Sequence, residues 1–305
     1  MAVWEDQPLL TTVVGSYPSG ELPPRRAVQR AVEDQIEAGV ELIADGQVRG
    51  DMVTTFAERI PGYHMAADGA WVILDALDRP DMPIAVADYA LAQRIAAGRA
   101  AVKGVVTGPI TLALSSRVSP SSPYFGPNDP TLILRLAEIM AHEVAALVAA
   151  GAEVVQIDEP MLGKALGRDV TPELVENALR EIAALPACPI LHVCGDIRRI
   201  AGELLALPFA GLDLEGASMD NLSSLDADAL EYVGMRVSYG CVDTRSDEVE
   251  PIAVVRERVQ AATRTLGAEK LWISPDCGLR QLSPEAAKAK LTVMVEAVQD
   301  VRAGL

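Results

Sequence analysis

Short runs of apolar and β-branched residues alternate along the whole chain with longer stretches that have helical periodicity. Each short run ends in Gly, Pro or a polar residue, as buried parallel strands commonly do. The pattern predicts eight strands, over residues 11–16, 41–45, 102–107, 154–158, 190–194, 211–215, 236–242 and 271–276. It predicts helices over residues 25–38, 130–150, 171–185, 249–266 and 283–301.

Eight strands with helices between them favour a (β/α)₈ barrel, or TIM barrel, over an open α/β sheet. No repeat and no linker-like composition divides the chain, so residues 1–305 are expected to form a single catalytic barrel domain. Two stretches leave the alternation. Residues 60–83 are expected to form an excursion between the second and third strands. The Ser- and Pro-rich residues 115–130 are expected on the catalytic face, either as a lid or as a surface loop without a special role.

Composition and charge narrow the classes of partner. Half of the 305 residues are hydrophobic, which is enough for a large core. With 43 Asp and Glu against 26 Lys and Arg, the formal charge is −17, which argues against nucleic acid or an anionic membrane as main partner. The most apolar stretch, residues 139–157, is interrupted by charged residues, and the N-terminus lacks the basic region of a signal peptide. A cytoplasmic protein is expected.

Candidate metal ligands follow three predicted strands. His192 and Cys194 alternate on the fifth strand and so face the same way, Glu215 ends the sixth, and Cys277 follows the eighth. The carboxyl ends of barrel strands meet at one mouth, so the four side chains are expected together. Two thiolates, an imidazole and a carboxylate form a plausible zinc site, although each residue alone is more often structural.

The chemistry of such a site favours thiols. The ligand set brings three negative charges to the cation, which suits a zinc-bound thiolate better than a zinc-bound hydroxide. The expected reaction is therefore S-alkylation by direct displacement. The other two cysteines, Cys188 and Cys241, are interpreted as structural thiols, and no C-x-x-C pair is present.

These residues and the segments around them indicate a known protein family. The chain resembles, nearly from end to end, the C-terminal catalytic domain of cobalamin-independent methionine synthase. The resemblance is carried by TTVVGSYPS (11–19), DGQVRGDMV (45–53), VKGVVTGPITL (102–112), VVQIDEPML (154–162), LHVC (191–194), LDLEGAS (212–218), VDTRSDEV (242–249) and LWISPDCGL (271–279). It implies a TIM barrel shared with uroporphyrinogen decarboxylase-like enzymes, and a zinc ion held by His192, Cys194, Glu215 and Cys277 that binds the homocysteine sulfur.

The resemblance also implies a pocket for L-homocysteine. Asp158 matches the carboxylate that receives the ammonium group of the substrate; from the residues alone, an internal salt bridge with an Arg is the alternative. A family Glu corresponds here to Gln47, unless Asp51 takes its place. The amino-acid part of the substrate matches the segment Val14, Gly15 and Ser16.

Four departures from the family concern the methyl donor. The second barrel of the long members is absent before the first strand, and the aromatic residue that stacks on the pterin is replaced around residues 114–116. An acidic residue is replaced by Lys164, and the histidine that protonates the leaving nitrogen is replaced by Arg245. Together they suggest the short, core form of the family. Methylcobalamin, free or on a corrinoid carrier protein, is then the expected donor; the alternative is that another residue supplies the proton and folate is retained.

Other functions compete with the methylation of homocysteine to L-methionine. A related barrel could methylate a different thiol such as coenzyme M, although the pocket at Ser16 and Asp158 favours an amino acid. A zinc- or corrinoid-binding protein without catalysis is a third possibility. A role like that of uroporphyrinogen decarboxylase fits least, because that chemistry uses arginines rather than a thiolate zinc site.

Overall fold

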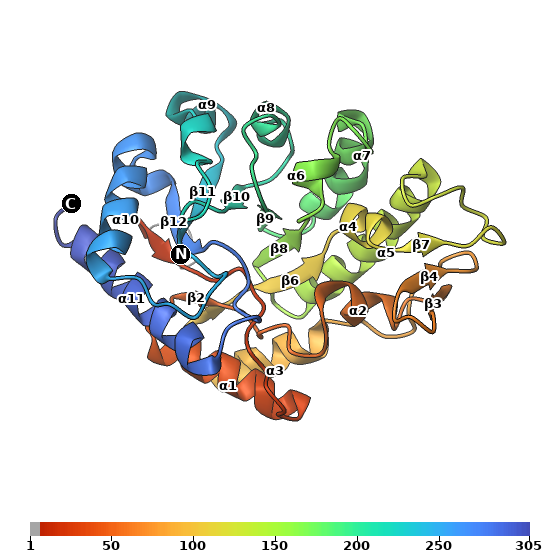
Figure 1. The fold of residues 1–305 in the computed structure, drawn as a ribbon, viewed down its shortest axis with the longest axis horizontal. Helices are drawn as coiled ribbons and strands as arrows, with labels where there is room; N and C mark the ends of the chain where they lie inside the picture. The colour runs from red at the N-terminus through yellow and green to blue at the C-terminus, as the bar shows by residue number, and fades with distance from the viewer. Residues whose placement is uncertain (1–6) are drawn as a thin grey trace.

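Parallel pairing joins seven strands into one sheet in the computed structural model, which describes residues 7–305 (Figure 1). Every neighbouring pair in this sheet is parallel, as expected when a helix connects successive strands. In spatial order the strands are β1 (Leu10–Thr11), β12 (Leu271–Pro275), β11 (Arg236–Val242), β10 (Gly211–Leu214), β9 (Cys188–Val193), β8 (Val154–Asp158) and β6 (Gly104–Thr107).

Two further strands close this sheet into a ring. β2 (Leu42–Ile43) pairs in parallel with β5 (Ala101–Val102), which continues through Lys103 into β6. On the other side of β2, Thr12 bridges to Leu42 just after β1 ends. The expected (β/α)₈ barrel of the α/β class is confirmed, with all eight predicted strand positions in the ring.

Helices surround the ring on its outer face (Figure 1). Three of the long ones begin at an N-cap side chain followed by proline, a combination that favours the start of a helix: Asp129, Thr171 and Ser283 are the caps. The helices are α1 (Pro24–Glu37), α2 (Met52–Ala57), α3 (Val86–Ala96), α4 (Pro109–Leu114), α5 (Pro130–Ala149), α6 (Leu162–Ala165), α7 (Pro172–Ala183), α8 (Ala201–Leu205), α9 (Ala227–Val233), α10 (Ile252–Leu266) and α11 (Pro284–Arg302), with single 3₁₀ turns at Leu222–Ser224 and Ala268–Lys270.

The first two barrel strands are shorter than predicted. Side chains replace strand partners there: Lys103 Nζ donates to the carbonyl oxygen of Val13, and Gln156 Nε2 to that of Val14 at 2.7 Å. Ala44 has both of its main-chain groups bonded to the Gln35 side chain of α1. The main-chain polar groups therefore keep hydrogen-bond partners where the strands end, and the chain can turn toward the mouth of the barrel.

The two irregular stretches pack on each other. The excursion at residues 60–83 contains the hairpin β3 (Tyr63–Met65) and β4 (Trp71–Ile73), and β7 (Arg117–Val118) from the 115–130 loop pairs with β4. Within residues 7–305, no segment of 115–130 lines the cavity described below, so its role as a lid stays a prediction. No helix in the described part of the chain is long and apolar enough to cross a membrane.

Candidate metal centre and substrate cavity

Three of the four predicted zinc ligands meet at the mouth of the barrel. His192 lies near the end of β9, Cys194 follows that strand, and Cys277 follows β12. His192 Nε2 is 3.1 Å from Cys194 Sγ, which is 3.6 Å from Cys277 Sγ, and the three donor atoms lie within 4.8 Å of one another. Both thiols are free. Two sulfurs and an imidazole nitrogen at this spacing can hold one zinc ion.

A buried carboxylate orients the histidine toward the sulfurs. Asp213 Oδ1 is 2.7 Å from His192 Nδ1, and the two residues are 0% and 1% exposed. They are direct neighbours in the register of β9 and β10. Because metal-binding histidines usually give their second nitrogen to such a partner, the arrangement fits a metal ion at Nε2. Sequence analysis missed Asp213, although its alternation with Glu215 on one strand could have indicated it.

The electrostatics of the cluster favour a thiolate. The hydrogen bond from Cys194 lowers the pKa of Cys277 well below its ordinary value, against the opposing effect of burial. Burial lowers the pKa of His192, but the neighbouring thiols and Asp213 outweigh it and raise that pKa well above its ordinary value. These pKa shifts favour a protonated imidazole beside a thiolate. A bound cation would take the place of the imidazole proton.

The fourth predicted ligand, Glu215, lies beside the cluster and is not one of its three grouped donors. Its carboxylate accepts hydrogen bonds from the main-chain N–H of Gly195, at 2.7 Å, and from the Ser218 hydroxyl, at 3.0 Å. Gly195 directly follows Cys194. The carboxylate is therefore tied to the loop that carries one of the ligands.

A cavity of about 240 Å³ opens onto the metal ligands. Ser16 from the segment after β1 lines it together with Asp158, which ends β8. Gly15 packs just behind, where a Cβ would lie 3.2 Å from Gln47 Oε1. Four of the five predicted homocysteine residues and three of the four predicted metal ligands thus surround one space, lined by Val14, Ser16, Gln47, Asp51, Met52, Asp158, Pro160, His192, Cys194, Cys277, Gly278, Arg280 and Gln281.

Asp158 is a buried carboxylate that forms no salt bridge with a Lys, Arg or His of the described part of the chain. It is 2% exposed and accepts hydrogen bonds from the side-chain amides of Gln156, at 2.6 Å, and Gln47, at 3.4 Å. Burial raises its pKa to about 6. The alternative prediction of a salt bridge with an Arg is not met among residues 7–305, so a bound ammonium group can supply the missing charge.

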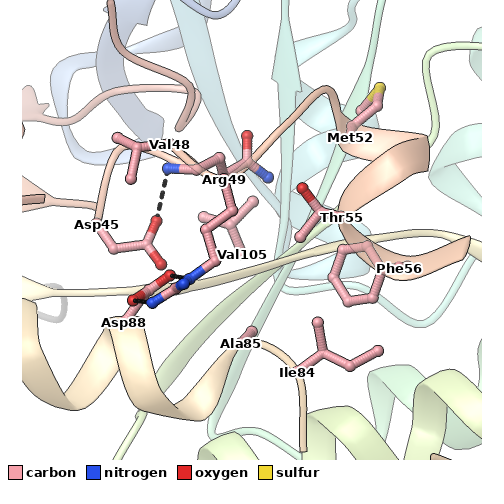
Figure 2. A pocket seen from close by; sticks show the side chains of 11 residues that line it. Asp45, Val48, Arg49, Met52, Thr55, Phe56, Ile84, Ala85, Asp88 and Val105 are labelled. Carbon is pink, nitrogen blue, oxygen red and sulfur yellow. Dashed lines mark hydrogen bonds and ion pairs between the residues drawn. The ribbon is translucent and has the colours of Figure 1, made fainter. Parts of the chain in front are cut away.

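The loop after β2 is anchored outside the cavity. A smaller pocket there contains Asp45, which accepts a hydrogen bond from the main-chain N–H of Gln47 at 2.8 Å (Figure 2). The guanidinium of Arg49 forms a two-pronged ion pair with Asp88 of α3, one contact being 2.7 Å. Asp51 caps α2 through the N–H groups of residues 53 and 54. The loop is therefore fixed with Gln47, rather than Asp51, against Asp158.

The residues that differ from the family pattern lie on the surface or at the end of a helix. Arg245 is 64% exposed and pairs with Asp243 at 2.6 Å. Lys164 is exposed on α6, and residues 114–116 end α4. The two remaining cysteines are buried away from the cavity, as predicted for structural thiols.

Comparison with known proteins places this site in a family. The sequence profile described as the catalytic domain of cobalamin-independent synthase matches residues 19–300. The chain belongs to this family. The predicted family is thereby confirmed, and the shared region includes all four candidate metal ligands.

Named relatives cover the chain nearly completely. A "Methionine synthase" of Methanothermobacter marburgensis is 36% identical, over 96% of this chain and 100% of that protein. A "5-methyltetrahydropteroyltriglutamate--homocysteine methyltransferase" of Nitratidesulfovibrio vulgaris (strain Miyazaki F) is 32% identical over 92% of this chain, which matches 37% of that longer protein. These names agree with the prediction of an enzyme that is a methyltransferase acting on homocysteine.

Solved structures agree on the fold. A B12-independent methionine synthase from Shewanella sp. W3-18-1, in complex with selenomethionine, superposes with a TM-score of 0.79 over 97% of this chain and 98% of that one, at 20% identity. A methyltransferase from Methanosarcina mazei gives a TM-score of 0.72 at 14% identity, over 97% of this chain and 94% of that one.

The prediction of methylcobalamin as cofactor and methyl donor is wrong, and so is that of a corrinoid carrier protein as partner. The matching family is cobalamin-independent, and the methyltransferase of N. vulgaris is named for a pteroyl donor. The prediction rested on four departures from the family taken together, of which the loss of the acid at Arg245 was the most informative. Since a leaving nitrogen can be protonated by another acid or by water, the residue at one position does not determine the donor.

Proposed function

We propose that this chain transfers a methyl group from a 5-methyltetrahydropteroyl (folate) donor to the thiol of L-homocysteine, forming L-methionine with the help of zinc. The observation that carries the proposal is the shared cavity of His192, Cys194, Cys277 and Asp158. A thiol-directed metal centre and an unpaired carboxylate there face the same space. We further propose that residues 1–305 act as one catalytic domain.

In this proposal zinc is held by the imidazole of His192 and the thiolates of Cys194 and Cys277. Glu215, tied to the loop after Cys194, is proposed as the fourth ligand. When bound there, zinc lowers the pKa of the substrate thiol and keeps the sulfur as a nucleophilic thiolate. Asp213 fixes the ring of His192 so that Nε2 stays directed at the metal position.

The distance between the two halves of the site suits homocysteine. Asp158 and His192 are direct partners in the register of β8 and β9, and neighbouring strands are about 4.8 Å apart. In homocysteine only the chain Cα–Cβ–Cγ separates the nitrogen from the sulfur. The ammonium group can therefore meet Asp158 while the sulfur reaches the ligands. Coenzyme M has no ammonium group, so it would leave this carboxylate unpaired.

The proposed reaction is a direct displacement at the methyl carbon of the donor. Homocysteine loses its thiol proton, and the sulfur attacks the methyl carbon of the donor in line with the nitrogen–carbon bond. The S–CH₃ bond forms as the N–CH₃ bond breaks, and the electron pair stays on nitrogen, which takes up a proton. The cavity contributes by holding the thiolate in one orientation and by excluding water from it.

The experiment supplies zinc-loaded protein with homocysteine and 5-methyltetrahydropteroyltriglutamate and measures methionine. His192→Ala and Cys277→Ser are expected to lose both zinc and methionine formation while circular dichroism still shows a folded barrel. Cys241→Ala removes a buried thiol outside the cavity and is expected to keep zinc. Methionine formation by a metal-free variant at the wild-type rate would overturn the proposal, as would wild-type protein that forms none.

A further inference from the structure

Arg280 is the single Lys or Arg among the described residues that line the substrate cavity. It follows Cys277 by three residues and is partly buried. One of its N–H groups donates to the main-chain carbonyl of Gln47. In residues 7–305 no carboxylate pairs with it at salt-bridge distance, so the rest of the guanidinium has no acceptor of opposite charge.

The energetics of this position favour an incoming anion. Burial lowers the pKa of Arg280, which shows that its charge has lost part of its water, while Asp51 nearby acts in the opposite direction. A partly desolvated guanidinium gains most from a charged acceptor that can take two of its hydrogen bonds, and a carboxylate has that geometry.

The other cations near the cavity already have partners. Arg49 is held by both oxygens of Asp88 (Figure 2) and is not among the residues that line the cavity. Lys103 is buried, and its ammonium group donates to the carbonyl of Val13 and the side chain of Gln156. Neither is free to bind an anion in the cavity, which leaves Arg280.

Gln47 links Arg280 to the site for the ammonium group. Its side-chain amide donates to Asp158 at 3.4 Å, and its main-chain carbonyl accepts from Arg280. The negative charge of Asp158 and the positive charge of Arg280 therefore both lie beside Gln47. The ammonium and carboxylate groups of an α-amino acid are likewise attached to the same carbon, so one substrate can reach both.

Main-chain contacts hold Arg280 in position. The N–H of Leu279 donates to the carbonyl of Ser16 at 2.8 Å. A Cβ at Gly278 would overlap Ser16 Oγ, so the loop after Cys277 approaches as closely as it does because residue 278 is glycine. The segment that bears the metal ligand thus also places the guanidinium.

We propose that Arg280 binds the α-carboxylate of the thiol substrate and, with Asp158, restricts the site to α-amino-acid thiols. This inference rests on the proposed function and adds a residue that sets substrate specificity. The competing source of a carboxylate is the glutamate tail of the methyl donor, which the experiment separates from the amino acid.

The experiment compares Arg280→Met and Arg280→Lys with two thiols, homocysteine and 3-aminopropane-1-thiol, which keeps the ammonium group and lacks the carboxylate. Arg280→Met is expected to raise the KM for homocysteine by about 10- to 100-fold, as expected for the loss of a charged hydrogen bond. The KM for 3-aminopropane-1-thiol is expected to stay close to its wild-type value, because this thiol has no carboxylate to bind the guanidinium. Arg280→Lys keeps the charge and is expected to fall between Arg280→Met and the wild type.

Zinc content and thermal stability of both variants show whether the loop is intact, because Arg280 also holds Gln47. An equal rise in KM for both thiols would overturn the inference, and so would a rise confined to the KM for the donor. If wild-type protein methylates neither thiol, the proposed function fails. Arg280 is then still tested by calorimetric binding of the two thiols to the zinc-loaded protein, where only homocysteine should lose affinity in Arg280→Met.

Discussion

At the scale of single residues, the hydrogen bond between Asp213 and His192 controls how well the site can hold a metal. Asp213→Asn keeps the shape but removes the negative charge, so the ring of His192 is less firmly oriented and less basic. We expect zinc affinity to fall by about 10- to 100-fold. Competition with a chromophoric chelator measures this directly. Asp196→Asn makes the same charge change on an exposed loop residue paired with Arg198, and its zinc affinity should match that of the wild type.

Asp158 gives a second test at this scale. Asp158→Asn should raise the KM for homocysteine and leave zinc content unchanged, because the ammonium group loses its charged partner. In the wild type, burial raises the pKa of Asp158 to about 6, so the carboxylate is ionised above that pH. Homocysteine affinity should therefore weaken as the pH falls through 6. Calorimetry across this range checks it, and an unaltered pH dependence in Asp158→Asn would contradict the assignment.

Much of the site could be predicted from the sequence because strand ends of a barrel converge. His192, Cys194 and Cys277 were predicted together from their positions alone, and the structure brings their donor atoms together. The supporting residues were harder to find. Asp213 depends on the register between two strands, and Arg280 on the path of a loop, and neither is written in the local pattern of residues.

At the scale of elements, the pattern located every barrel strand but not every boundary. Hydrophobic runs mark where a strand is buried, and they do not show where side chains take over the hydrogen bonds of the backbone. Lys103 and Gln156 do so after β1, and Gln35 does so after β2. Lys103 and Gln156 act on segments distant in sequence, and Gln35 acts across the connection from a helix to a strand, so the periodicity of a single segment could not reveal these replacements.

The start of α3 depends on a buried side chain from another helix. Glu143 of α5 accepts hydrogen bonds from the N–H groups of Ile84 and Ala85, at 2.9 and 2.7 Å, where α3 has no cap of its own. Glu143→Ala leaves these groups buried and unpaired, so unfolding free energy should fall by about 2–3 kcal/mol. Glu138→Ala, on the exposed side of α5, should cost less than about 0.5 kcal/mol in the same urea titration. Equal losses in the two variants would show that Glu143 does not support α3.

At the scale of the whole molecule, the last helix is fastened to the first strands, where the barrel ring closes. Arg302 at the end of α11 donates to the carbonyls of Pro8 and Leu9 and pairs with both oxygens of Glu41, just before β2. Glu41 also accepts hydrogen bonds from the N–H and hydroxyl of Thr11. The ion pair between Arg302 and Glu41 thus joins β1, β2 and the last helix, α11, at the end of the barrel opposite to the cavity.

This fastening should respond to pH in a defined direction. Burial raises the pKa of Glu41, but the hydrogen bonds from Arg302 and Thr11 outweigh it and lower that pKa below its ordinary value of about 4.3. The lowered pKa means that the stabilisation is complete above about pH 4.3 and is lost as the pH falls through the folded-state pKa.

Arg302→Met should therefore lower the unfolding free energy at pH 7 by about 2–3 kcal/mol, since a partly buried charged acceptor loses its partner. The difference from the wild type should shrink in denaturant titrations as the pH falls through the folded-state pKa of Glu41, because the carboxyl group then becomes neutral in both proteins. Arg256→Met is the control. It breaks an exposed ion pair between Arg256 of α10 and Asp300 of α11, the helix that also carries Arg302, and should cost less than about 1 kcal/mol at pH 7. A loss in Arg302→Met that stayed constant from pH 7 to 3 would mean that the bonds to the two carbonyls, rather than the ion pair with Glu41, hold the last helix against the start of the barrel.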